Sequence, residues 1–126
     1  MNKAIKITMC LCFDAALVSL AGCRKTVDEN KSVSEIRAEA EKMSVNDLKA
    51  MAEKYKNAIL AKKADIEKYT NQLKDVPVGD LMGDKAKKLG TDVEKATISI
   101  AALTERFNIY IEKLREKGGD TSGLDI

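Results

Sequence analysis

Apolar residues recur at alternating spacings of three and four along most of the chain. This is the period of an amphipathic α-helix and of a coiled-coil heptad. The longest such series begins at Val45 and stops just before Pro77. Its members are Val45, Leu48, Ala52, Tyr55, Ile59, Lys62, Ile66, Tyr69, Leu73 and Val76. We predict a helix from Val45 to about Asp75, because the residue before a proline disfavours the helical conformation.

A second series with the same period follows the proline. Its members are Met82, Ala86, Leu89, Val93, Ala96, Ile100, Leu103, Phe107, Tyr110 and Leu114. Gly118 and Gly119 come directly after it and are typical of a helix C-terminus. We therefore predict a second long helix up to residue 117, followed by a disordered tail at residues 118–126.

A short helix is predicted before the two long ones. Ser32 and Glu35 have the spacing of a capping box. Apolar residues at helical spacing follow at Val33, Ile36, Ala40 and Met43. Ser44 then has the features of a new N-cap, which predicts a break at Met43–Ser44.

These patterns predict an all-α fold, an antiparallel two-helix coiled-coil hairpin with a short preceding N-terminal helix, over residues 32–117. A tight turn near Pro77 would place Tyr69 opposite Ala86 and Val45 opposite Tyr110. This pairing sets small alanines against large partners, as dense packing requires. A slip of one heptad is the main alternative.

The two series of apolar residues would form a seam along which the two long helices pack. Some residues of the predicted helices do not fit this seam. Lys62 is the charged member of the first series, and we expect its stem to cover Val93 while its ammonium group reaches water. The alternative is that Lys62 sets the register or the choice of partner, as polar residues at such positions can. The three tyrosines are expected to bury their rings and hydrate their hydroxyls. Several apolar residues lie off the seams, namely Met51, Leu60, Ile98, Ala101, Ala102 and Ile109. The short helix, a second copy or a protein partner would have to cover them.

The first 22 residues have the layout of a secretory signal peptide. Lys3 and Lys6 precede an apolar run that reaches Leu20, and two small residues follow. Asp14 interrupts the run, and a carboxylate there costs about 2.5–3.5 kcal/mol on insertion scales. We interpret residues 1–22 as a cleaved leader.

The sequence Leu20-Ala21-Gly22-Cys23 resembles the lipobox of bacterial lipoproteins. The resemblance implies cleavage between Gly22 and Cys23, with a lipid on the Cys23 thiol that attaches the protein to a membrane. By the same resemblance, Arg24 in place of aspartate favours the outer membrane, facing the periplasm, over the inner membrane. Residues 23–31 would then be the lipidated cysteine and a flexible tether, since residues 24–31 are almost entirely polar.

Cys10 and Cys12 are not expected to contribute a disulfide or a metal site to the mature protein. Cys10 and Cys12 lie in the predicted leader, so a mature chain would keep only Cys23. No disulfide could then form within one chain, although the compartment is oxidising.

Composition excludes several classes of function. The chain has no His and a net charge of +2, with charged residues at 33%. It contains no phosphate-binding loop, no H-E-x-x-H and no G-x-S-x-G. We expect no enzymatic activity, no cofactor, no metal and no nucleic-acid partner.

The sequence is similar in kind to small coiled-coil lipoproteins of the cell envelope. It predicts a membrane-anchored structural or protein-interaction module that binds a protein partner or itself through its helix faces. The alternative is a periplasmic carrier or chaperone-like module for apolar ligands or unfolded chains.

Overall fold

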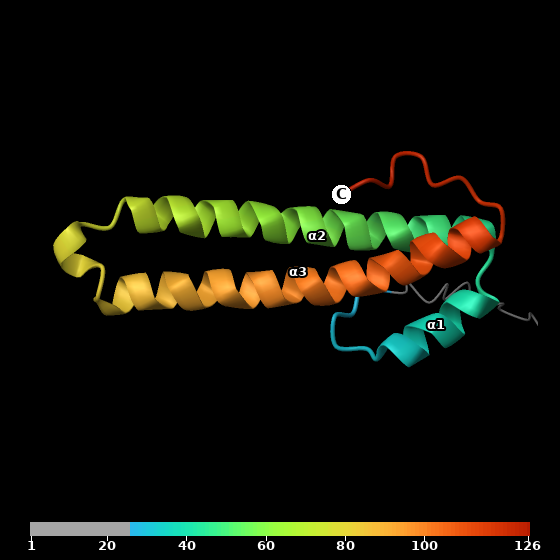
Figure 1. Ribbon diagram of the computed structural model, residues 1–126, viewed down its shortest axis with the longest axis horizontal. Coiled ribbons are helices and arrows are strands. Elements are labelled where there is room, and N and C mark those ends of the chain that lie inside the picture. Colours follow the sequence, from blue (N-terminus) through green and yellow to red (C-terminus); the bar gives the residue numbers. More distant parts are fainter. Residues whose placement is uncertain (1–25) are drawn as a thin grey trace, which may run out of the picture.

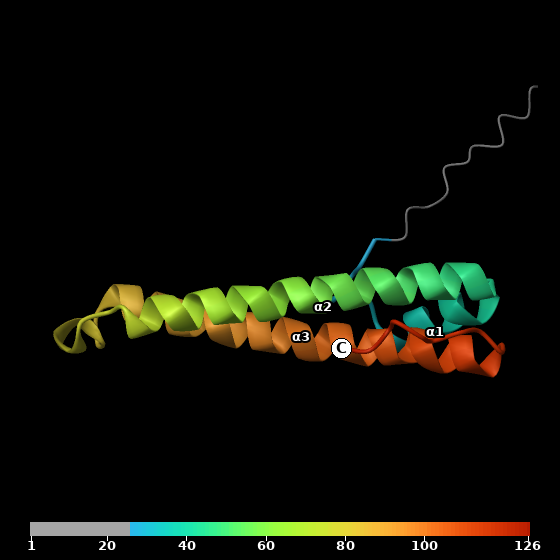
Figure 2. The same ribbon diagram turned by 90° about the horizontal axis from the view of Figure 1, so that it is seen from above.

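The structure, a computed structural model, describes residues 26–126. Within this range the chain forms α1 (Val33–Lys42), α2 (Val45–Lys74), the single-turn 3-10 helix η1 (Val78–Asp80) and α3 (Asp84–Glu116). These residues form no strand. The predicted all-helical fold with one short and two long helices is therefore confirmed. Figures 1 and 2 show α2 and α3 side by side along the long axis, with α1 against them at the end far from η1.

The starts of α1 and α2 follow from local capping chemistry. The Glu35 N–H donates to Ser32 Oγ at 3.3 Å, and the Ser32 N–H donates to Glu35 Oε2 at 3.1 Å. The Asp47 N–H donates to Ser44 Oγ at 3.2 Å in the same way. Met43 between the two helices has an extended backbone. The predicted capping box and the predicted break at Met43–Ser44 are both confirmed.

The connection between the long helices is longer than the predicted tight turn. The Asp80 N–H donates to the Pro77 carbonyl at 2.8 Å, and the Gly83 N–H donates to the Asp80 carbonyl at 2.9 Å. These turns occupy the chain up to Gly83, so α3 begins only at Asp84. Met82, which the heptad spacing placed in the core, lies outside the helix and is 83% exposed. That prediction was wrong.

The predicted pairing of α2 and α3 is also wrong, because the observed contacts differ from it by nine to ten residues. Val45 was expected opposite Tyr110. Instead the Tyr110 ring packs on the Tyr55 ring, with centroids 5.3 Å apart. Val45 lies beside Gly119, where an added Cβ would come within 2.9 Å of Val45 Cγ1. The longer connection moves α3 along α2 in these contacts by more than the one-heptad slip that the sequence left open.

The hydrophobic core is unevenly distributed along the molecule. The larger group of buried residues, here called the main cluster, joins α1 to the adjoining halves of α2 and α3 and includes Leu48, Tyr55 and Leu103. A small second cluster near η1 consists of Val76, Ala86 and Leu89. α1 therefore completes the core at one end only.

The C-terminal residues 118–126, predicted to be disordered, pack against the helices instead. Gly118 has a φ of 72°, and the Gly119 N–H donates to the Leu114 carbonyl at 2.8 Å. This Schellman arrangement reverses the chain so that it returns along the helices. Leu124 is only 3% exposed and belongs to the main cluster. Lys56 Nζ donates to the Gly123 carbonyl at 2.7 Å.

Candidate functional site: the N-terminal strap and the exposed tip

The sequence-predicted site residues Gly22 and Cys23 lie outside the described residues. The structure does describe the segment just after them, residues 26–31, here called the strap. The sequence predicted a flexible tether here, but the strap is attached to the helices. Val27 packs against the main cluster.

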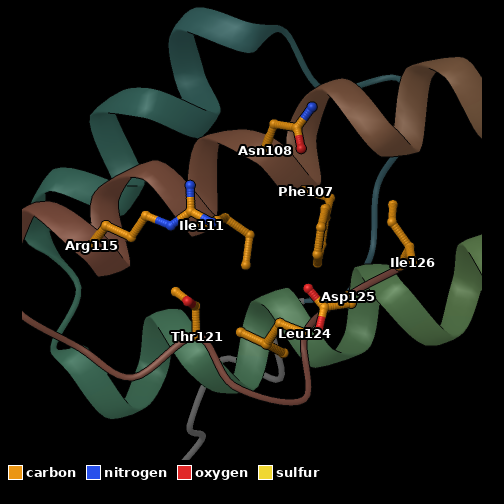
Figure 3. A pocket seen from close by; sticks show the side chains of 8 residues that line it. All are labelled: Phe107, Asn108, Ile111, Arg115, Thr121, Leu124, Asp125 and Ile126. Atoms are coloured by element: carbon orange, nitrogen blue, oxygen red, sulfur yellow. The ribbon is translucent and has the colours of Figure 1, made fainter.

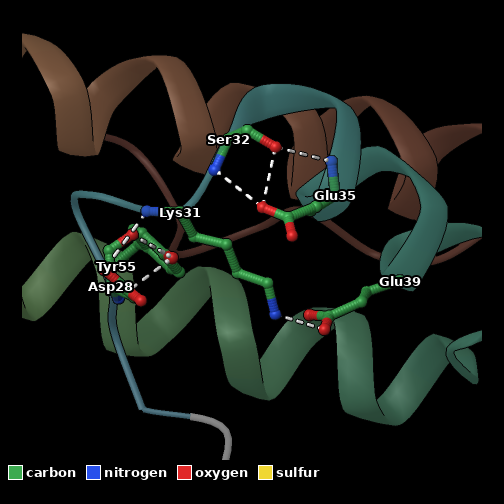
Figure 4. A network of polar contacts seen from close by, with 6 residues as sticks. All are labelled: Asp28, Lys31, Ser32, Glu35, Glu39 and Tyr55. Atoms are coloured by element: carbon green, nitrogen blue, oxygen red, sulfur yellow. Dashed lines mark hydrogen bonds and ion pairs between the residues drawn. The ribbon is translucent and has the colours of Figure 1, made fainter.

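Tyr55 of α2 holds the backbone of the strap. Its hydroxyl donates to the Asp28 carbonyl and accepts from the Asp28 N–H, both at 3.3 Å. The Asp28 carboxylate in turn accepts from the N–H groups of Asn30 and Lys31, at 2.8 and 3.2 Å. Figure 4 shows this turn leading directly into the capping box of α1. Burial raises the pKa of the Tyr55 hydroxyl above its ordinary alkaline value, so the hydroxyl stays protonated and able to donate even in alkaline solution.

Arg106 of α3 holds the strap from the other long helix. Its side chain is buried, and its Nε and Nη2 donate to the Lys31 carbonyl at 2.9 and 2.5 Å. Nη1 donates to the Ala102 carbonyl at 2.8 Å, and Glu105 Oε2 lies 3.8 Å away. A buried guanidinium needs such acceptors, because an unpaired buried charge is strongly destabilising.

Two further polar contacts complete the attachment. Ser99 of α3, which is buried, donates to the Glu29 carboxylate. Lys31 pairs with Glu39 of α1, and this bond raises the pKa of Lys31. The strap is therefore bonded to all three helices.

A second feature lies at the opposite end of the molecule. Residues 77–83, here called the tip, connect α2 to α3 and contain three exposed apolar side chains. Val78 is 86% exposed and Met82 is 83% exposed, while Leu81 is about half exposed. Apolar side chains gathered at one exposed end indicate a contact surface.

Three of the surface hollows are shallow and bordered by charged residues. One of about 210 Å³ lies under the C-terminal residues and is lined by Phe107, Asn108, Ile111, Arg115, Thr121, Leu124, Asp125 and Ile126 (Figure 3). A second, of about 540 Å³, lies between Asn108 and Glu116 on α3. The third, of about 300 Å³, lies between the strap and Lys62. Lys62 thus borders the strap, and its predicted neighbour Val93 does not line this hollow.

The apolar residues outside the two heptad series differ in burial, with Ala101 exposed and Ala102 half-buried. Met51 and Ile109 are buried in the main cluster, which α1 completes. Leu60 and Ile98 remain exposed. Sequence reasoning missed Ser99 and Arg106 as strap residues, since a lone polar residue in a helical pattern does not reveal a distant carbonyl or carboxylate partner.

Residues 26–126 contain no helix that is long and apolar enough to cross a membrane. The same residues contain no cluster of three or more potential metal ligands. Comparison with known proteins finds no matching family, no similar curated protein and no similar solved structure.

Proposed function

We propose that this protein is a lipid-anchored, non-enzymatic module of the bacterial cell envelope. Its Cys23 would carry the lipid, in the outer membrane facing the periplasm. Its body, an antiparallel coiled-coil hairpin, would offer helix faces to a protein partner or to a second copy.

The observation that supports this proposal best is the attachment of the strap. Asp28 comes only five positions after Cys23, so the lipidated residue lies within about 17 Å of the first bonded residue even when the chain is fully extended. A flexible tether would make no hydrogen bonds to a buried arginine and a buried tyrosine. The bonds from Arg106 and Tyr55 to the strap instead hold the body in a defined position relative to its anchor.

The helices offer surface for a partner. The exposed side chains of Leu60 and Ile98 lie on the two long helices. The heptad series of α2 and α3 and their side-by-side packing support the coiled-coil description. Coiled-coil surfaces commonly select their partners through charged residues that flank the apolar positions.

The alternative, a carrier for apolar ligands or unfolded chains, finds less support. Pockets for small molecules are mostly apolar and enclose most of the ligand. The largest of the three hollows described above is bordered by Glu112, Arg115 and Glu116 and is open to solvent. We therefore place the interaction module first.

Metabolic labelling with an alkynyl fatty acid tests the anchor directly. The full chain expressed in a bacterium is expected to take up the label and to fractionate with the outer membrane. Cys23→Ser should abolish labelling and leave an unprocessed precursor. Cys12→Ser is the matched control, because Cys12 lies in the predicted leader and should not change labelling. Labelling that persists in Cys23→Ser would refute the proposal.

A further inference from the structure

The apolar tip is the most conspicuous unassigned surface of the described residues. Val78 and Met82 are the most exposed large apolar side chains there, and they lie within five residues of each other. Figure 1 places this connection at the far end of the long axis from α1. Val78, Leu81 and Met82 do not belong to the small second cluster near η1, so the core gives no reason for apolar residues to gather at this position.

Lysines surround the tip. Four exposed lysines lie at or near the adjoining helix ends, at Lys74, Lys85, Lys87 and Lys88. None of them forms an ion pair with a carboxylate of residues 26–126. Three aspartates at positions 75, 80 and 84 leave only a small net positive charge. Exposed apolar side chains with lysines beside them are typical of a shallow contact with a lipid headgroup layer.

The small size of the tip favours a lipid surface over a protein. A stable protein interface buries about 800 Å² on each partner, from about 20–30 residues. Three apolar side chains in a seven-residue connection cannot provide this. A bilayer interface requires no complementary shape and accepts a few apolar side chains among its headgroups.

We propose that the tip is a second membrane contact, which inserts Val78, Leu81 and Met82 at headgroup depth into the bilayer that holds the lipid anchor. This inference rests on the proposed anchor at Cys23. From Tyr55, where the strap is attached, α2 runs about 28 Å further to Lys74. With an anchor within about 17 Å of Asp28, the tip reaches the same bilayer when the molecule lies along its surface.

Tryptophan fluorescence tests this proposal, because the natural chain has no Trp. Met82→Trp places the only indole at the tip, and Ile98→Trp places it at an exposed site on α3 as the matched control. Each processed, lipidated variant is reconstituted into vesicles of phosphatidylethanolamine and phosphatidylglycerol that contain a lipid with a headgroup-level quencher. We expect a blue shift and quenching at position 82 and neither at position 98. Equal quenching at both positions, or none at 82, would overturn the proposal.

A second substitution separates insertion from misfolding. Val78→Asp in the Met82→Trp background should remove most of the quenching and leave helix content and the unfolding midpoint unchanged, since the Val78 side chain is 86% exposed. Unchanged quenching would overturn the proposal. So would sedimentation that shows tip-dependent dimers together with an unquenched Trp, because a second copy would then be the occupant.

The anchor and the tip can fail separately. The buried apolar residues of the described chain lie between Ile36 and Leu124, and strap residue Val27 packs on them, so a chain that starts at residue 24 retains the whole core. This unlipidated body is expected to bind the same vesicles weakly, and Met82→Asp should reduce its partitioning about tenfold, which corresponds to 1.4 kcal/mol. Equal partitioning of the unlipidated body and its Met82→Asp variant would overturn the tip proposal, even if Cys23 is labelled in the full chain. A difference without labelling of Cys23 would support the tip and refute the anchor.

Discussion

Arg106 illustrates how much one side chain contributes to the position of the strap. It is 8% exposed, yet its donors are directed at backbone carbonyls of the strap and of α3 itself. A bond from a charged donor contributes more to stability than a neutral one, about 1.5–3 kcal/mol. Neither its sequence neighbours nor the heptad spacing distinguishes Arg106 from the exposed arginines. Its role depends on a carbonyl 75 residues away, which no local pattern encodes.

We expect Arg106→Ala to lower the free energy of unfolding by about 2–3 kcal/mol. The substitution removes the two hydrogen bonds that the Arg106 guanidinium donates to the Lys31 carbonyl, and that carbonyl then lacks a donor from α3. Arg115→Ala is the control, because Arg115 is exposed and should change stability by less than about 0.5 kcal/mol. Urea unfolding followed by circular dichroism measures both. Equal effects would show that the strap contributes nothing through Arg106.

At the scale of the helices, local sequence signals predicted most boundaries. Ser32 and Ser44 begin α1 and α2 as expected because their side chains satisfy free N–H groups of the first turn. The start of α3 was missed because its N-cap, Gly83, makes no side-chain bond and Met82 satisfies the heptad spacing. The C-terminal residues were missed because the stretch is mostly polar and its two large apolar residues, Leu124 and Ile126, form no helical period, so only tertiary packing shows that Leu124 is buried.

Two glycines near opposite ends of α3 should respond in opposite ways to alanine. Gly90 lies inside the helix with open space around it, so Gly90→Ala should stabilise the protein by about 0.5–1 kcal/mol. At Gly119 an added Cβ would lie 2.2 Å from Leu114 Cδ1, so Gly119→Ala should destabilise it. Thermal unfolding should show a higher midpoint for the first and a lower one for the second. A higher midpoint for Gly119→Ala would mean that the C-terminal residues do not pack in this way.

At the scale of the whole molecule, the heptad series correctly predicted that two long helices would form. It could not determine their relative position, because a repeating pattern satisfies several registers almost equally well. The position depends on the length of the connection, and the 3-10 turn at Val78–Asp80 carries no heptad signal. The strap was missed for a related reason. A polar segment has no apolar period, and its partners lie on distant helices.

A double-mutant cycle tests the observed register. Tyr55→Leu and Tyr110→Leu should couple by about 0.5–1.5 kcal/mol, because their rings are in contact. Val45→Ala and Tyr110→Leu should be additive within about 0.5 kcal/mol, although the sequence pairing placed these two residues opposite each other. The free energy of unfolding of each single and double variant supplies the numbers. Strong coupling between Val45 and Tyr110, with none between Tyr55 and Tyr110, would support the register predicted from the sequence.

The uneven core has a consequence for how the molecule opens. Between the tip and the main cluster, α2 and α3 are held by few buried side chains, whereas the strap, α1 and the C-terminal residues all reinforce the other half. Amide protons near the tip should therefore exchange with deuterium through local fraying. Those around Tyr55 should exchange only when the entire chain unfolds. The tip can loosen and close again while the strap remains bonded, so the molecule combines a compliant end with a rigid one.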